Sequence, residues 1–190
     1  MLISAAHAQP KIGLIDLRKV FDNYYKTKQA DTNLKDEAGD LEKQRKEMVD
    51  EFKKGEAEYK RLMEKANDQA ITVEERASSK QAAEKKFIEL KDIEQTVGRF
   101  EQSSRAKLGE KQRRKRDAIL QEIREIVNAK AKTSGFTMVI DVAASSINDT
   151  PVVMYNNGDN DLTEMVLNQL NASAPPLSKT EEAPKTDAKK

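Results

Sequence analysis

Cysteine and tryptophan are missing from the 190 residues, and histidine occurs once, as His7. Without cysteine the chain has no disulfide framework, no thiol nucleophile and no cysteine-ligated zinc site. A single imidazole near the N-terminus excludes multi-histidine metal sites and gives no basis for a Ser-His-Asp triad. Gly13 and Gly158 stand alone, so there is no Gly-rich phosphate loop and no indication of ATP. We therefore expect the protein to have no enzymatic activity, no cofactor and no metal site.

Proline is absent from residues 11–150 and falls at positions 10, 151, 175, 176 and 184. A proline inside a helix costs about 3 kcal/mol, so its absence permits helix almost throughout residues 17–134. Residues 173–190 hold three of the five prolines and alternating charges without apolar periodicity. This composition predicts a disordered tail.

Long apolar runs are also lacking, and no stretch of 18 apolar residues is present to span a membrane. The segment Ala6-His7-Ala8 has the small-x-small pattern of a secretory cleavage site, although a basic region and a full apolar stretch do not precede it. We interpret residues 1–8 as the remainder of an export signal, with Gln9 beginning the mature chain. An ordinary N-terminus is the alternative.

What the chain has in quantity is charge, at 35% of residues, with a net charge of only +1. Such a composition fits long solvated helices better than a compact globule. Apolar residues repeat at alternating spacings of four and three, which predicts a left-handed coiled coil. Arg45 and Gly55 interrupt a seam that is otherwise apolar or tyrosine. We expect the seam, including Phe52 and Tyr59, to pack a second helix rather than to face outward. Its positions are 34, 38, 41, 45, 48, 52, 55, 59, 62 and 66.

The heptad register fails at residues 67–72, where Thr72 and Glu75 have the spacing of a capping box. A second helix therefore begins at residue 73, and Gly135 is a good stop for it. So short a connection makes the two helices antiparallel. The prediction is a helical hairpin over residues 17–134 with its turn near 68–72. The stripe expected on the second helix is Phe87, Leu90, Ile93 or Glu94, and Val97.

The flanking segments are typical of a small β-rich body, residues 9–16 and 135–172. Strands are predicted at 12–16, 136–142 and 152–155, followed by a helix over 162–170 that Asp161 caps. These elements make a poor core for one chain, so we expect copies of the chain to complete it. Residues assigned to this oligomerisation body are Ile12, Leu14, Phe136, Met138, Ile140, Val142 and Val153.

A basic cluster lies in residues 105–116, where seven cations face only Glu110. It can attract phosphate, anionic lipid or acidic polypeptides, or it can be a solvated stretch that pairs with acids on the opposite helix. Elsewhere we expect ordinary surface pairs such as Glu56–Lys60 and Lys80–Glu84. The cluster consists of Arg105, Lys107, Lys111, Arg113, Arg114, Lys115 and Arg116.

The order of these segments resembles the Skp/OmpH family of periplasmic chaperones of Gram-negative bacteria. The specific part is Lys11-Ile12-Gly13-Leu14-Ile15-Asp16 before a long charged helix, then Met138-Val139-Ile140-Asp141, and the segment from Asp161 to Leu167. The resemblance covers about residues 11–171. Any coiled coil would match the helical arms, so they add little to it.

The resemblance implies a mainly α fold in which helical hairpins project from a small β-barrel body, assembled as a homotrimer. It implies an ATP-independent periplasmic holdase that keeps unfolded outer-membrane proteins from aggregating in transit. The match to the family's lipopolysaccharide-binding residues is too loose to transfer any of them, so contact with lipopolysaccharide or anionic lipid stays open. We expect no nucleic acid partner, because no aromatic residues interleave the basic cluster. The alternative is a structural coiled-coil scaffold of the cell envelope.

Overall fold

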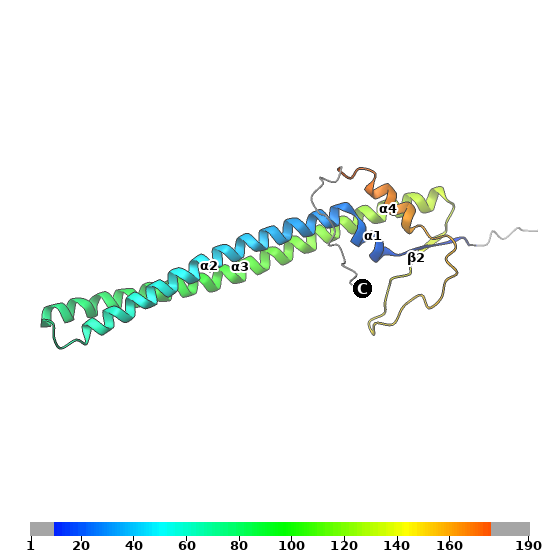
Figure 1. The fold of residues 1–190 in the computed structure, drawn as a ribbon. Coiled ribbons are helices and arrows are strands. Elements are labelled where there is room, and N and C mark those ends of the chain that lie inside the picture. The colour runs from blue at the N-terminus through cyan, green and yellow to red at the C-terminus, as the bar shows by residue number, and fades with distance from the viewer. Residues whose placement is uncertain (1–9, 176–190) are drawn as a thin grey trace, which may run out of the picture. The chain divides into compact units, whose positions relative to one another are not determined.

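The computed structural model describes residues 10–175, so the predicted export remnant and residues 176–190 of the predicted tail lie outside the described residues. Helix dominates, with two short strands (Figure 1). The elements in chain order are β1 (Ile12–Ile15), α1 (Leu17–Asn23), α2 (Tyr25–Ala66), α3 (Val73–Thr133), β2 (Met138–Asp141) and α4 (Thr163–Asn171).

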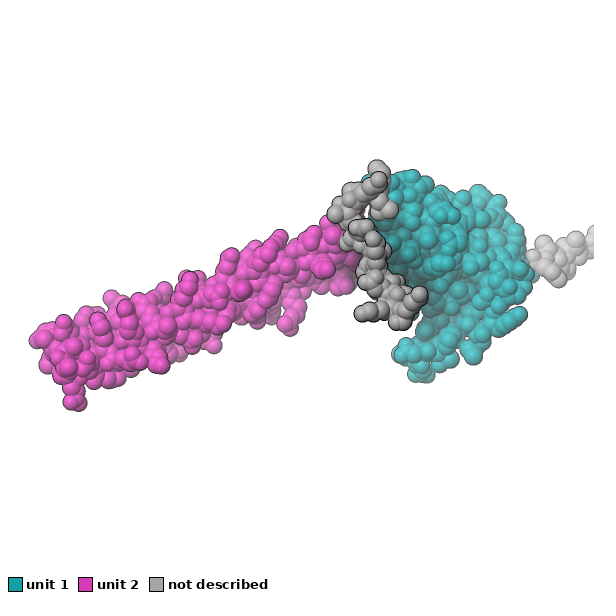
Figure 2. Space-filling view, in the orientation of Figure 1, with its two compact units in different colours: residues 1–28, 118–190 teal, residues 29–117 magenta. Residues whose placement is uncertain are grey.

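The chain divides into two compact units, coloured separately in Figure 2. Residues 29–117 form the hairpin unit, and the described residues of 1–28 and 118–190 form the body unit. Both divisions fall inside the long helices, whereas the sequence predicts borders at the ends of the hairpin. The helix ends belong to the body because their side chains, such as Ile119 and Ile123, are buried in its core.

In the hairpin unit α2 and α3 run antiparallel and side by side (Figure 1). All ten predicted heptad positions of α2 are at least half-buried, although most of their neighbours are exposed. The predicted seam is therefore confirmed as an intramolecular one. On α3, Phe87 differs from the expected stripe because its side chain is 46% exposed. Lys86 takes the seam position instead, because its stem is covered while its ammonium reaches Glu58.

Gly55 does not interrupt α2. A Cβ at this position would lie 2.8 Å from Cδ2 of Leu90, which is only 6% exposed. The missing side chain thus gives Leu90 its space in the seam, in the manner of a knob entering a hole.

The ends of α3 follow the predicted signals. The Glu75 N–H donates to Oγ1 of Thr72 at 3.2 Å, and the Thr72 N–H donates back to Glu75 at 3.0 Å. These hydrogen bonds from Thr72 lower the pKa of the Glu75 carboxyl. At the other end Gly135 has φ +71°, and the Phe136 N–H donates to the carbonyl of Ala131 at 2.9 Å. The capping box and the glycine stop are both confirmed.

In the body unit β1 and β2 pair in parallel, with Ile12 opposite Met138 and Ile15 opposite Asp141. On its other edge β1 contacts the segment before α4, where the Leu162 N–H donates to Leu14 at 2.8 Å. The residue that borders α4 is Leu162, and the predicted cap Asp161 acts from one position earlier, since its carboxylate accepts from the Thr163 N–H at 2.8 Å.

The predicted third strand, residues 152–155, is wrong. This segment is an irregular loop within the described chain, held by a single bridge between Ser145 and Pro151. Met154 and Tyr155 are 80% and 84% exposed. Four consecutive apolar or aromatic residues are typical of a strand, but this segment pairs with no strand of the described chain.

A second difference is a break after α1. The sequence predicts one helix from residue 17, but Tyr24 has ψ 128°, so α2 begins anew at Tyr25. Tyr24 is 3% exposed and its phenol donates to Glu122 at 2.7 Å. The break therefore lets a large side chain enter the body core with its hydroxyl satisfied.

Candidate functional site

All seven residues of the basic cluster are exposed on α3. Lys111 forms an ion pair with Glu37 of α2, and Arg114 pairs with Glu110 within α3. The proposed pairing with the opposite helix thus holds for one residue of the seven. The other five form no ion pair with any residue of 10–175: Arg105, Lys107, Arg113, Lys115 and Arg116.

The cluster covers two faces of α3 rather than one. Lys107, Lys111 and Arg114 follow spacings of four and three and so share a face. Arg105 and Arg116 are separated by about three helical turns and share the opposite flank. Any single anion would therefore meet about half of the cluster.

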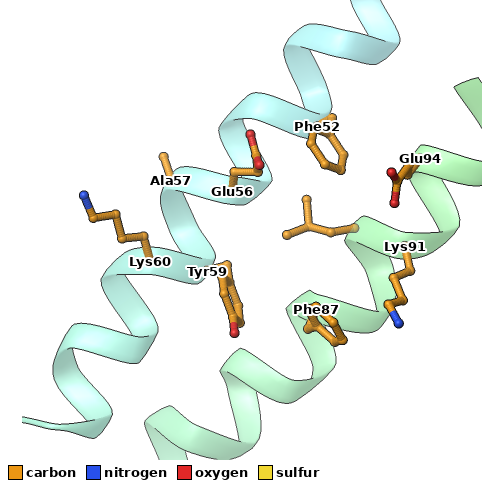
Figure 3. A pocket seen from close by; sticks show the side chains of 9 residues that line it. Phe52, Glu56, Ala57, Tyr59, Lys60, Phe87, Lys91 and Glu94 are labelled. Atoms are coloured by element: carbon orange, nitrogen blue, oxygen red, sulfur yellow. The ribbon is translucent and has the colours of Figure 1, made fainter.

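An aromatic groove lies between α2 and α3 in the hairpin unit, with a volume of about 490 Å³. Figure 3 shows the rings of Phe52 and Tyr59 from α2 and Phe87 from α3 directed into the space between the helices. The rings of Tyr59 and Phe87 are 5.9 Å apart, and Nζ of Lys91 is 4.8 Å from the Phe87 ring centre. Cation–π attraction holds that ammonium over the exposed ring.

The groove continues along α2. An adjoining hollow of about 480 Å³ shares Tyr59 and Phe87 and reaches Met63 and Ala66. Sequence reasoning placed Phe87 inside the seam and so missed the groove. The sequence signal that could have revealed the groove is the position of Lys86. This residue precedes Phe87 and has the spacing of a seam residue, which leaves Phe87 outside the seam.

Ion pairs in the hairpin unit join the two helices as well as neighbouring turns of one helix. Arg45 reaches Glu101 at 3.5 Å, and Lys86 reaches Glu58 at 3.0 Å. The predicted surface pairs Glu56–Lys60 and Lys80–Glu84 are not formed within the described residues. Each of these four side chains faces solvent, where an i,i+4 pair is worth only a few tenths of a kcal/mol.

Except for Val153, which lies in the loop at 152–155, the predicted body residues lie on or directly beside the two strands. Ile12 and Met138, which pair across the sheet, are 41% and 56% exposed. A groove of about 580 Å³ runs along β2, and within the described chain no strand pairs with the outer edge of β2. The structure leaves the remaining predicted residues half-buried: Leu14, Phe136, Ile140, Val142 and Val153.

The body unit also contains one polar network. Glu122 accepts from the Tyr24 hydroxyl at 2.7 Å and from the Lys26 ammonium at 2.8 Å. The hydrogen bonds from Lys26 and then Tyr24 lower the pKa of Glu122. Burial, followed by the bond to Glu122, raises the pKa of Tyr24 to about 12. These hydrogen bonds connect the residues at the break, Tyr24 and Lys26, to Glu122 of α3.

In the described part of the chain no group of three or more acidic or histidine side chains is placed to hold a metal ion. Among its helices none is both long enough and apolar enough to cross a bilayer. The structure thus presents two surfaces of interest: the groove and cations of the hairpin unit, and the open sheet edge of the body unit.

The model of a family described as outer membrane protein (OmpH-like) matches residues 11–170, which include parts of both units. No curated protein matches the chain.

Proposed function

The chain belongs to the OmpH-like family, and from this membership we propose that it is an ATP-independent holdase of the periplasm. It would bind unfolded outer-membrane proteins and prevent their aggregation on the way to the outer membrane. The match over residues 11–170 carries this proposal, because members of the family are periplasmic chaperones.

The surface of the hairpin unit supports this function. Its exposed large apolar side chains are few, with Val73, Phe87 and Ile88 the most prominent, and charged side chains surround them. Contacts of this kind are individually weak and require no particular client geometry. A surface that makes many of them binds diverse unfolded chains and itself stays soluble.

We propose that three copies assemble through the body unit. The support is the open outer edge of β2, the groove beside it, and the exposure of Met138 and Ile12. A two-stranded sheet is marginal by itself, and added strands from other copies would cover the edge. Light scattering on the purified protein would then give three times 21.4 kDa.

The basic cluster has a proposed role in client capture. Five cations without ionic partners in residues 10–175 create a positive potential on α3, which would speed encounter with acidic unfolded chains. The same cations could contact anionic lipid, including lipopolysaccharide.

The test is refolding of a urea-denatured outer-membrane barrel protein by dilution, with turbidity as the readout. A holdase suppresses the turbidity at stoichiometric amounts without ATP. A chain that serves only as a coiled-coil scaffold leaves the barrel protein to precipitate, and that outcome would refute the proposed function. A folded protein of similar charge, added in the same amount, is the control for non-specific crowding.

A further inference from the structure

Six charged side chains surround the aromatic groove and its continuation, and none has an ionic partner in residues 10–175. Nearby Lys86 pairs with both Glu58 and Glu89, so ion pairs do form in this stretch of the hairpin. Three of the six are carboxylates and three are ammonium groups, so the rim has both signs and no net charge. The six are Glu56, Lys60, Lys80, Glu84, Lys91 and Glu94.

The floor between these charges is apolar, and one pair of its residues has a spacing close to that of an extended chain. Tyr59 and Met63 are four residues apart on α2, or about 6 Å along the helix axis. In an extended chain, side chains on the same face recur about every 6.7 Å. From Phe52 to Ala66 the floor is about 21 Å long, which accommodates about six extended residues.

We propose that this groove binds an extended polypeptide segment in which apolar and charged side chains alternate. The apolar side chains lie on the aromatic floor, and the charged ones pair with the rim. The inference rests on the proposed function and narrows it, because alternation of this kind is the pattern of strands in membrane β-barrels. It assigns a preferred client sequence to one place on the hairpin.

Other occupants fit the groove less well. A continuous apolar segment would cover the rim charges without pairing them, at a desolvation cost. A uniformly acidic segment could pair with the three lysines of the rim but would leave Glu56, Glu84 and Glu94 without partners. An amphipathic helix is about 10 Å wide and packs through a broad apolar stripe, whereas the exposed apolar surface here is confined to a narrow line that includes Met63 and Phe87.

The test uses two labelled peptides of identical composition, one with alternating valine and charged residues of both signs, the other with the same residues in an apolar and a charged block. Fluorescence anisotropy with the full-length protein measures both affinities. We expect the alternating peptide to bind about tenfold more tightly. Equal affinities would overturn the inference.

Matched variants locate the binding. Phe87→Ser removes the exposed ring of the groove, and Ile88→Ser removes a neighbouring side chain that is 62% exposed and does not line it. The ratio of the affinities for the alternating and the block peptide should fall to near one in Phe87→Ser and should be unchanged in Ile88→Ser. Equal losses in both variants would contradict the proposal. A photo-crosslinker in place of Lys91 should label the alternating peptide, whereas one in place of Asp92 should not.

These results separate two failures. If the unaltered protein does not protect a denatured barrel protein at all, the proposed function is wrong. If it protects the barrel protein while the two peptides bind alike, the holdase function stands and only the assignment of the groove is wrong.

Discussion

Asn171, at the end of α4, caps the first turn of α2 by accepting a hydrogen bond from the Tyr25 N–H at 2.9 Å. The same amide donates to the carbonyl of Asn23, the last residue of α1, at 3.1 Å. One side chain therefore satisfies a backbone donor of α2 and a backbone acceptor of α1 on the two sides of the break. The break is compatible with a stable body because a residue 146 positions away completes it.

Replacing this cap should destabilise the body unit. Asn171→Ala removes both hydrogen bonds, and we expect the free energy of unfolding to fall by about 1–2 kcal/mol. Urea denaturation followed by circular dichroism measures the change. Asn168→Ala, at an exposed position of the same helix, is the control and should have little effect. Equal stability of the two variants would show that the cap contributes nothing.

Tyr24 should make stability fall at high pH. Its pKa is about 12 in the folded chain and near 10 when unfolded, so the folded chain holds this proton more tightly. The stabilisation is complete below pH 10 and is lost as the pH rises from 10 to 12. Tyr24→Phe should remove this part of the pH dependence and cost about 1 kcal/mol at neutral pH. Denaturation curves across this range, for both proteins, test the prediction.

The glycines of the long helices should respond differently to alanine. A Cβ at Gly98 would meet no other side chain or helix within 4 Å, so Gly98→Ala should stabilise the protein by about 0.5–1 kcal/mol through helix propensity. Gly55→Ala should gain less or lose stability, because its Cβ must displace Leu90. Thermal unfolding of the two variants side by side gives the comparison. A larger gain at Gly55 would contradict the packing described for the seam.

The edge of β2 should control assembly. Met138→Asp places a charge on the exposed side chain of this strand, and we expect the trimer to dissociate. Met165→Asp, at a residue 46% exposed on α4, is the matched control and should assemble normally. Light scattering over a range of concentrations reports the mass. An unchanged trimer in Met138→Asp would exclude this edge as the interface.

The basic cluster should affect capture rates and their dependence on salt. Reversing Arg105, Arg113 and Arg116 to glutamate should slow capture of an acidic client by about tenfold at low salt, and less at high salt. Stopped-flow fluorescence of a labelled unfolded client measures the rate. The comparison with the single reversal Arg116→Glu is Arg114→Glu, whose charge is already paired with Glu110 and whose reversal should slow capture less. If the capture rate of the unaltered protein does not depend on salt concentration, the proposed electrostatic attraction of clients is wrong.

The sequence was sufficient where structure depends on neighbours in the chain. Heptad spacing predicted the seam of α2, and the spacing of Thr72 and Glu75 predicted the start of α3, because both signals act within a few turns of helix. The hydrogen bond of Asp161 at the start of α4 and the end of α3 at Gly135 were predictable for the same reason. The family resemblance was confirmed over residues 11–170.

Features that depend on distant partners were not predictable in this way. The break at Tyr24 requires Glu122 and Asn171, which are 98 and 147 residues away in the chain. The apolar run of residues 152–155 resembles a strand, but such a run does not determine whether the segment pairs with a sheet edge. Phe87 and Lys86 are adjacent, and side-chain hydrophobicity favours Phe87 for the seam although the spacing to Leu90 favours Lys86.

The pairing of β1 with β2 has a consequence for the order of folding. Lys11 and Thr137, which hydrogen-bond beside the sheet, are 126 residues apart, whereas the turn at 67–72 brings together segments that are close in sequence. Contacts between residues close in sequence form faster than contacts between distant ones. The two long helices can therefore pair, beginning at their turn, before β1 pairs with β2. A chain that emerges with its N-terminus first must wait for residues 138–141 before β1 finds its partner. Truncation anywhere before that point would leave a nascent chain with paired helices and no sheet.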